Sequence, residues 1–504
     1  MFTNNSTPFG QFNLFINKIK CFIMNDLFNM FDKTQCKSLG ICSENPVLSS
    51  IDAVIINEIR QIAYYIVKLK ELNLINFKIM KEAISALSVY ITDTSFNKNL
   101  LVEFFLKLEN LKKETETFYN KKCREMGLNY EHLTTFSVKN DEGITSNTLI
   151  KWGEKILTHW YNTADENKIC LFDLIIFMAK TAANKLIEIQ NYKEANESEY
   201  FEVLRLLSLT NSTAVRSEKL TRRIREFSSF LYKLNEELIY ERNKFYGNRQ
   251  NVKIERSIVK GKSIFVIGGD IFELYNLLEK TKDLDINIYT NFSMMLAYIY
   301  PKFFEYKNFK GLYGTGDIEY DFSKFKGAIY VTEHSNTKLD NAIRGKIFTT
   351  KLIPSDNSTK IEKSNLTPLI EAALSEEGFE FDEYNKEITF EYDKSLLNKA
   401  IEGSEDKKIL ISMGKISDEI KEKYENYSEI NIKFPYDVES LIYLLNALPN
   451  NEKAVCFSKC CVEIIKIVTS ILNKNLNICL EECKISNVGP HILSALKKDF
   501  KVKL

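Results

Sequence analysis

The sequence predicts a multi-domain α + α/β protein, with N-terminal helical bundles followed by two α/β domains whose sheets are mostly parallel. Its 504 residues are more than one hydrophobic core usually serves, so two or three domains are expected. The spacing of apolar residues changes near residue 250, from a period near 3.6 to short β-rich runs. Beyond that point, strand-like runs alternate with helical patterns, as they do in βαβ units.

Before residue 250, apolar side chains recur every three or four residues, which places them on one face of a helix. Charged residues occupy the other faces, and this amphipathic pattern predicts helical bundles. The apolar positions that carry the pattern are Ile55, Ile59, Ile62, Ile66 and Leu69; Leu101, Phe104, Leu108 and Leu111; and Ile224, Phe227, Leu231, Leu234 and Leu238.

After residue 250, short runs rich in β-branched and aromatic residues predict strands. Helical patterns at 271–280 and 462–472 separate some of these runs, which favours a parallel arrangement. The predicted strands are 263–267, 286–290, 328–332, 409–412, 454–457 and 477–480.

These changes of pattern divide the chain into four expected parts: an N-terminal extension at 1–30, a helical-bundle domain at 31–250, and α/β domains at 251–360 and 361–504. The polar stretch 355–365 is expected to be the linker between the last two. Residues 1–24 have two lysines and no acidic residue, as organelle presequences often do. They lack arginine and no small-residue cleavage site follows, so we favour a plain extension.

Composition and charge exclude several classes of protein. The sequence has 68 lysine and arginine residues and 68 aspartate and glutamate residues, so its net charge is zero. This balance argues against binding to nucleic acids or anionic membranes, which depends on an excess of positive charge. Apolar residues make up 44% of the chain and aromatic residues 12%, which excludes disorder as the main state. No apolar run is long enough to span a membrane. The ten cysteines do not have the spacing of a secreted disulfide scaffold, so a reducing, cytoplasmic location is expected.

Two local motifs suggest chemistry, and each has a simpler interpretation. Gly268, Gly269 and Asp270 follow a predicted strand and precede a helix, where backbone amides can hold a phosphate. The third glycine of a dinucleotide fingerprint is missing, so we favour a structural turn. The four histidines are too far apart in sequence to indicate a metal site.

The cysteines near the C-terminus lie at two predicted strand ends, where their thiolates could share zinc or an iron–sulfur cluster. Their spacing is not that of a zinc ribbon, and free cysteine is commonly a buried, apolar residue. We therefore expect most of them to be packed as small apolar groups. The five residues are Cys456, Cys460, Cys461, Cys479 and Cys483.

The centre of the chain resembles the hybrid cluster proteins, the prismane or hydroxylamine reductase family, which are relatives of the carbon monoxide dehydrogenases. The resemblance is carried by FVIGGDIFELYNLLEK at 265–280, NIYT at 287–290, Tyr300-Pro301 and residues 311–316. It extends upstream through KFYG at 244–247 to Cys36 and Cys42, and downstream through Asp437 and Ser440. It therefore covers the chain from about residue 30 onward.

The resemblance implies a protein that reduces hydroxylamine or small nitrogen oxides. Such proteins hold a hybrid iron–sulfur–oxygen cluster between three domains through one histidine, two glutamates and several cysteines. A second cluster near the N-terminus is held by four cysteines. The resemblance thus implies that Gly269, Ser293, Ser335 and Pro435 converge on one space between the domains.

This sequence departs from the family pattern at almost every ligand position. The histidine position holds Gly269, and the first glutamate position holds Ser293. Three cysteine positions hold Ser335, Lys415 and Pro435, while the last glutamate falls near Cys460. A stretch with another cysteine is missing around 421–429. Of the four N-terminal cysteines only Cys36 and Cys42 remain, as a vestigial site.

Two functions follow from these departures. Glycine and proline offer no side-chain ligand, and lysine brings a positive charge, so the iron–sulfur cluster is expected to be absent. We favour a catalytically inactive, hydroxylamine reductase-like protein whose fold serves an unidentified protein partner. The alternative is an active oxidoreductase that uses an iron–sulfur site rebuilt from Cys36, Cys42 and the C-terminal thiols. Nucleic-acid and membrane partners are not expected.

Overall fold

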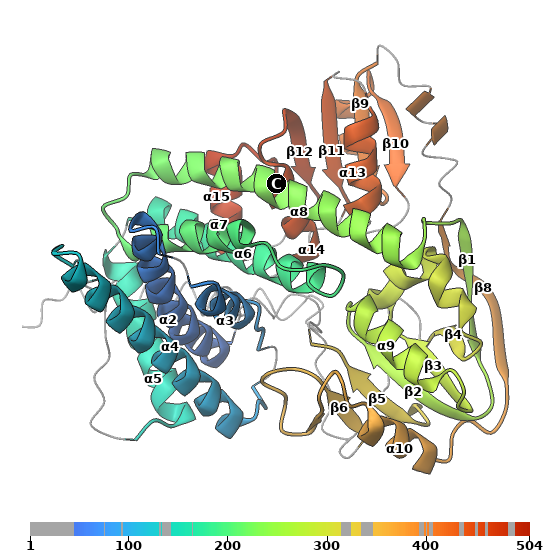
Figure 1. The fold of residues 1–504 in the computed structure, drawn as a ribbon. Helices are drawn as coiled ribbons and strands as arrows, with labels where there is room; N and C mark the ends of the chain where they lie inside the picture. The colour runs from blue at the N-terminus through green and yellow to red at the C-terminus, as the bar shows by residue number, and fades with distance from the viewer. Residues whose placement is uncertain are drawn as a thin grey trace, which may run out of the picture.

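The predicted fold class is confirmed: a mostly helical first half is followed by two parallel sheets (Figure 1). The computed structural model describes residues 45–74, 76–91, 94–130, 133, 143–163, 165–313, 324–333, 346–392, 398–399, 401–402, 407–432, 438–448, 452–458, 462–481 and 489–504. The expected extension at 1–30 lies outside these residues, and the expected domain boundaries stay a prediction.

The helical part begins where asparagine side chains cap the helices. Asn45 accepts a hydrogen bond from the amide of Val47, and Asn97 accepts one from the amide of Leu100. The predicted faces are buried, except that Phe105, and not Phe104, takes the core position in its helix. The helices are α2 (Pro46–Glu71), α3 (Phe77–Leu87), α4 (Lys98–Glu125), α5 (Ser146–Thr163), α6 (Glu166–Ile189), α7 (Glu197–Ser208) and α8 (Ser217–Tyr246).

The first sheet has six parallel strands in the order β4-β3-β2-β5-β6-β7. Its central strands are buried along almost their whole length because both faces are covered, as is usual for parallel sheets. The elements are β2 (Lys262–Ile267), α9 (Ile271–Thr281), β3 (Ile286–Thr290), the 3-10 helices η2 (Phe292–Ile299) and η3 (Pro301–Glu305), β4 (Phe309–Leu312), β5 (Ala328–Val331), β6 (Ile347–Thr349), β7 (Thr359–Lys360) and α10 (Thr367–Ser375).

The stretch 355–365, which the sequence indicated as a linker, contains β7. This strand pairs with β6, and the following helix α10 contacts β2 and β5. The chain therefore still packs against the six-stranded sheet after residue 360.

A two-stranded antiparallel ribbon closes this unit. It joins β1 (Val252–Ile258), directly after α8, to β8 (Glu383–Tyr392), with Val252 opposite Tyr392. Two register shifts interrupt the pairing near Glu255. The ribbon was not predicted from the sequence.

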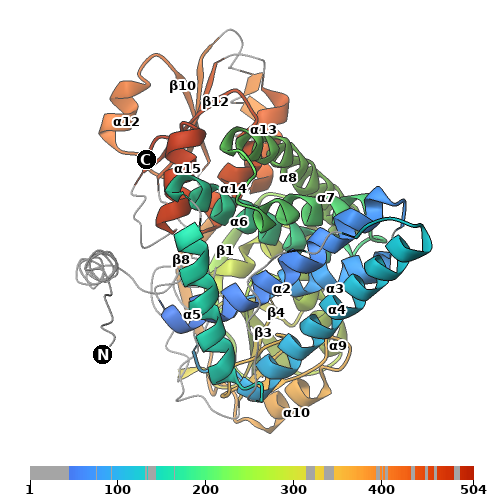
Figure 2. The same ribbon diagram turned by 90° about the vertical axis from the view of Figure 1, so that its left-hand side faces the viewer.

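The second sheet has four parallel strands in the order β10-β9-β11-β12. Its helices α14 and α15 pack against α8 and α6, so this sheet and the helical part share one hydrophobic core (Figure 2). The elements are β9 (Ile409–Met413), α12 (Asp418–Lys423), β10 (Ser428–Ile432), α13 (Val438–Ala447), β11 (Lys453–Phe457), α14 (Val462–Ile471), β12 (Leu476–Leu480) and α15 (Pro490–Asp499).

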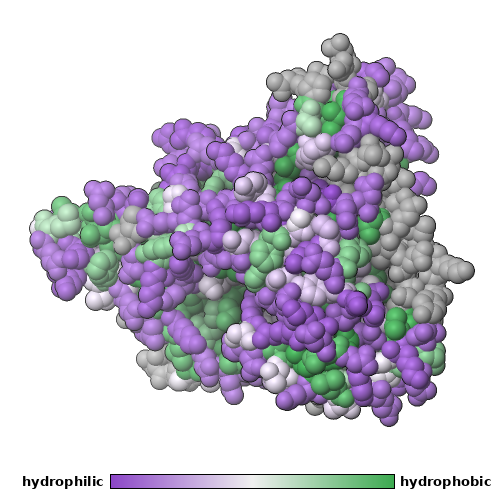
Figure 3. Space-filling model, turned by 45° about the vertical axis from the view of Figure 1, so that its right-hand side comes forward, coloured by the Kyte–Doolittle hydropathy of each residue, from purple (hydrophilic) through white to green (hydrophobic). Residues whose placement is uncertain are grey.

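The face of the molecule drawn in Figure 3 is mostly hydrophilic, with smaller apolar areas between the polar side chains. Among the described residues, no helix has the length and apolar character that crossing a bilayer requires.

A histidine–carboxylate pair joins α15 to α6. Nδ1 of His491 lies 2.7 Å from Oδ2 of the buried Asp173. Burial works against the charged imidazole, but the hydrogen bond and charge of Asp173 outweigh it and raise the pKa of His491. Because the pKa of His491 is higher in the folded protein, its pairing with Asp173 stabilises the fold fully below pH 6.5, the pKa of an unfolded histidine. This stabilisation is lost as the pH rises through the pKa of the folded state. Burial also raises the pKa of Asp173, and for this group too the contribution to stability falls as the pH rises.

We therefore expect His491→Gln to lower the thermal unfolding midpoint more at pH 6 than at pH 8. Exposed His159 on α5 provides the matched control, His159→Gln, which should change the midpoint little at either pH. Differential scanning calorimetry at the two pH values measures this. A midpoint loss for His491→Gln that is equal at pH 6 and pH 8 would contradict the assignment.

Candidate functional site

The carboxyl ends of β2 and β3 bring two of the expected ligand positions together. The amide of Asn291 donates to the carbonyl of Val266, and the Asn291 side chain accepts from the amide of Gly268 at 3.2 Å. These two hydrogen bonds hold the carboxyl ends of β2 and β3 side by side. As a result, a Cβ atom on Gly269 would lie 3.7 Å from the carbonyl oxygen of Ser293, an ordinary contact. The backbone would therefore accept a side chain at residue 269.

The turn after β2 uses its own carboxylate to cap α9. Asp270 accepts hydrogen bonds from the amides of Phe272 and Glu273, at 3.0 and 3.1 Å. Two amides that a phosphate would need are therefore already occupied. Gly268 has a φ of 134°, which only glycine adopts without strain. These contacts favour the structural turn over the nucleotide site.

A buried carboxylate cluster lies beside this turn. Glu273 accepts hydrogen bonds from the hydroxyls of Tyr330 and Thr350, at 2.5 and 2.7 Å. Nζ of Lys363 lies 3.0 Å from Glu273 and 3.7 Å from Glu333. Lys363 thus places an ammonium group among acidic side chains at the carboxyl end of the sheet.

The carboxyl groups of Asp270 and Glu273, at the start of α9, have pKa values that are shifted in opposite directions. Burial raises the pKa of Asp270, and the nearby charge of Glu273 raises it further. Burial also disfavours the charged form of Glu273, but Lys363 and the two hydroxyl groups outweigh it and lower that pKa. Glu273 is therefore the group that carries the negative charge.

The helical part and both sheets meet at Glu439, near the start of α13. Its carboxylate accepts from Nη1 of Arg242 at 3.1 Å and from the Tyr300 hydroxyl at 3.0 Å, and lies 3.5 Å from Nε of Arg249. Arg242 also binds Glu188 of α6, with Nε 3.0 Å from the carboxylate. Burial disfavours the Arg242 guanidinium, but Glu188 and Glu439 outweigh it and raise its pKa. We call Arg242, Arg249, Tyr300 and Glu439 the junction network.

A second charged group lies where α6 meets the start of α14, close in sequence to Cys460. Glu463 and Lys466 pair at 2.8 Å, and both charges influence Lys185 of α6. Burial lowers the pKa of Lys185 to about 8; Arg242 and Lys466 add to this shift, while Glu188 opposes it. The Glu463 side chain is 51% exposed, so this group lies at the edge of the contact between the helical part and the second sheet.

The carboxyl end of the second sheet carries Lys415 and two of the five thiols. Lys415 follows β9 and is exposed. Cys456 on β11 faces Cys479 on β12, and both are buried. The structure thus brings together Gly269 with Ser293, and Cys456 with Cys479. The remaining predicted positions lie outside the described residues: Cys36, Cys42, Ser335, Pro435, Cys460, Cys461 and Cys483.

The described donors do not fit the iron–sulfur cluster that the resemblance implies. Gly269 has no side chain, Ser293 offers a hydroxyl and Lys415 an ammonium group, whereas iron in such clusters needs thiolate, imidazole or carboxylate. Within the described part of the chain, no three histidine, cysteine or acidic side chains gather as a metal site would require.

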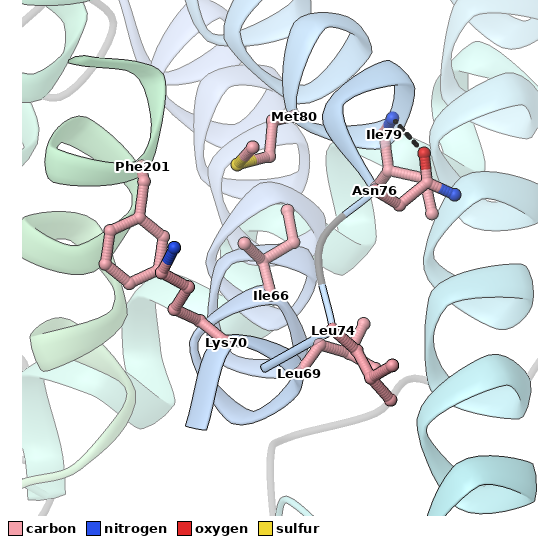
Figure 4. A pocket seen from close by; sticks show the side chains of 8 residues that line it. All are labelled: Ile66, Leu69, Lys70, Leu74, Asn76, Ile79, Met80 and Phe201. Carbon is pink, nitrogen blue, oxygen red and sulfur yellow. Dashed lines mark hydrogen bonds between the residues drawn. The ribbon is translucent and has the colours of Figure 1, made fainter. Parts of the chain in front are cut away.

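A small crevice between α2, α3 and α7 offers no alternative site for chemistry (Figure 4). Apolar side chains such as Ile66, Met80 and Phe201 line most of it. Asn76 uses its side chain to cap α3, and the Lys70 ammonium lies 5.6 Å from the Phe201 ring.

Sequence reasoning missed the junction network and Lys363. Arg242 and Glu439 are 197 positions apart and each lies in an amphipathic helix, where charged residues usually face solvent. The resemblance indicated Tyr300, which belongs to the network, and Ser440, next to Glu439, but gave neither residue a role.

Comparison with known proteins agrees with the fold. The sequence model of the Prismane/CO dehydrogenase family matches residues 21–442. A hydroxylamine reductase of Acidiphilium cryptum (strain JF-5) is 24% identical over 352 residues, covering 69% of this chain and 63% of that protein. One from Actinobacillus succinogenes is 31% identical over 209 residues, covering 39% of this chain and 37% of that protein. The chain thus spans less than two thirds of the length of either relative. With most of its length matched, this chain belongs to the Prismane/CO dehydrogenase family.

Proposed function

We propose that this chain is a catalytically inactive relative of the hydroxylamine reductases, kept as a cytoplasmic binding or scaffold protein. The observation that supports the proposal is the closeness of Gly269 and Ser293 at neighbouring strand ends. The resemblance implies a histidine and a glutamate at these positions, and neither glycine nor serine is an iron ligand of this family.

The charges around these strand ends support the same conclusion. The Lys363 ammonium pairs with Glu273 and Glu333 at the carboxyl end of the first sheet. Exposed Lys415 stands where a cysteine is expected on the second sheet. A positive side chain at either place opposes the binding of a metal cation. The junction network fills part of the interface between helices and sheets with ion pairs, which keeps the inherited fold together.

Anaerobic reconstitution with ferrous iron and sulfide tests the proposal. We expect no stoichiometric iron, no visible iron–sulfur absorption band, and no hydroxylamine-dependent oxidation of a reduced viologen dye above the protein-free rate. The hydroxylamine reductase of Acidiphilium cryptum, treated in parallel, provides the positive control.

The alternative, an active oxidoreductase with a rebuilt iron–sulfur site, predicts the opposite result. It would give an absorption band and turnover that both disappear in Cys460→Ser but survive in Cys170→Ser. Cys170 is a suitable control because it is a buried thiol in α6, on another element. That outcome would replace the proposed function with the alternative.

A further inference from the structure

Cys456 and Cys479 occupy facing positions on neighbouring parallel strands. The strands β11 and β12 lie side by side (Figure 1), and in their register Cys456 pairs directly with Cys479. Facing residues point to the same side of a sheet, and neighbouring strands lie about 4.7–4.9 Å apart. Disulfide-bonded cysteines usually have Cα atoms about 4.4–6.8 Å apart, so the backbone already has the required separation.

The two thiols are close enough to influence each other's ionisation. The partner thiol is the largest influence on each of them: it lowers the pKa of Cys479 and raises that of Cys456. Burial opposes ionisation of Cys479, while the positive charges of Lys423 and Lys503 favour it. Cys479 is the more exposed of the two thiols and has the lowered pKa, so it is the better nucleophile of the pair.

A thin cover separates the pair from solvent. Cys456 is 0% exposed and Cys479 is 5% exposed. Ile420 of α12 belongs to the same apolar cluster as the two cysteines, and so does Tyr424, the residue that directly follows this helix. This helix has only six residues, and the loop before it is held by hydrogen bonds from Ser417 to Glu481. Figure 2 shows α12 at the periphery of the molecule. So short an element opens locally at low free-energy cost, which gives small molecules intermittent access.

We propose that Cys456 and Cys479 are a peroxide-sensitive thiol pair that closes to a reversible disulfide. The Cys479 thiolate attacks hydrogen peroxide, its sulfur is oxidised to sulfenic acid, and the O–O bond breaks to release hydroxide. The Cys456 sulfur then attacks the Cys479 sulfur, expels that hydroxyl group, and gives up its own proton to form water. Overall, two thiols and one peroxide become one disulfide and two waters, and a dithiol reductant reverses the change.

Treating the full-length, folded protein with hydrogen peroxide tests this proposal. The reaction is quenched with N-ethylmaleimide under denaturing conditions, and the peptides are analysed by mass spectrometry without reduction. We expect a cross-linked peptide joining Cys456 to Cys479 that disappears after dithiothreitol. Cross-links that join Cys479 only to Cys483, Cys460 or Cys461, or no cross-link at Cys479, would overturn the proposal.

The order of steps is tested by two single variants. In Cys456→Ser, the oxidised Cys479 cannot be resolved by its partner, so a dimedone adduct should accumulate at Cys479. In Cys479→Ser, peroxide should leave Cys456 unmodified. Cys123→Ser removes a buried thiol of α4 and should keep the full yield of cross-link. Equal dimedone labelling of Cys456 and Cys479 in the two variants would contradict the assigned roles.

If Cys456→Ser fails to fold, as judged by circular dichroism, Cys456→Ala replaces it. Its smaller side chain avoids placing a hydroxyl in the apolar cluster, and the same dimedone adduct is expected. If folded Cys456→Ala gave no dimedone adduct at Cys479, the proposed order of steps would be overturned as well.

Discussion

Glu439→Ala should lower the free energy of unfolding by about 3–5 kcal/mol, the usual effect of removing one partner of a buried ion pair. The side chain of Glu439 is 4% exposed, and it faces two guanidinium groups that are 10% and 9% exposed. Without the carboxylate, Arg249 loses this charged partner, Arg242 keeps its pairing with Glu188, and the Tyr300 hydroxyl loses this acceptor. Urea denaturation followed by circular dichroism gives the change.

Glu305→Ala is the matched control, because Glu305 is 62% exposed and pairs with Lys302 of the same short helix. Exposed pairs of this kind contribute about 0–1 kcal/mol. The junction network would not be the stabilising contact described here if the two variants unfolded at the same urea concentration.

Gly153→Ala should lower the free energy of unfolding by about 1–3 kcal/mol, because it overpacks the contact between α5 and α2. A Cβ atom at residue 153 would lie 1.9 Å from the carbonyl oxygen of Ser50 and 2.6 Å from its Cα atom. These are backbone atoms of a buried helix, so no side-chain rotation relieves the overlap. The two helices would have to move apart.

The control is Gly143→Ala, since a Cβ atom there meets nothing within 4 Å. Thermal unfolding followed by circular dichroism should give a lower midpoint for Gly153→Ala and an unchanged one for Gly143→Ala. Similar midpoints for both variants would mean that α2 and α5 adjust freely, against the close contact seen here.

The sequence predicted the helix faces and the central strands because both follow from local periodicity. Ile59 and Ile62 lie one turn of helix apart and are fully buried, as expected. The ribbon of β1 and β8 could not be found in this way. Its strands are more than 120 positions apart and carry many charged residues, and pairing across such distance depends on the rest of the fold.

The site was less predictable than the fold. Family resemblance placed Gly269 and Ser293 near each other, and in the structure a Cβ atom added to Gly269 would lie 3.7 Å from the carbonyl oxygen of Ser293. The buried charges of Arg242, Glu439 and Lys363 were indistinguishable from surface charges, because burial depends on tertiary packing. For Cys456 and Cys479, the sequence placed both thiols on strands, but only the register of those strands made them partners.

The ribbon of β1 and β8 makes the six-stranded unit an inserted module. The chain enters at Val252 and leaves at Tyr392, and these residues face each other across two neighbouring strands. The helices before the module and the sheet after it share a continuous core, whereas the module has cores of its own. It is attached through these adjacent strands, through the contacts around Tyr300 and Glu439, and through the backbone pairing of Phe96 with Ser355. Attachments at separate places oppose hinge motion of the module, so the exposed residues Gly269 and Ser293 keep their position relative to the shared core.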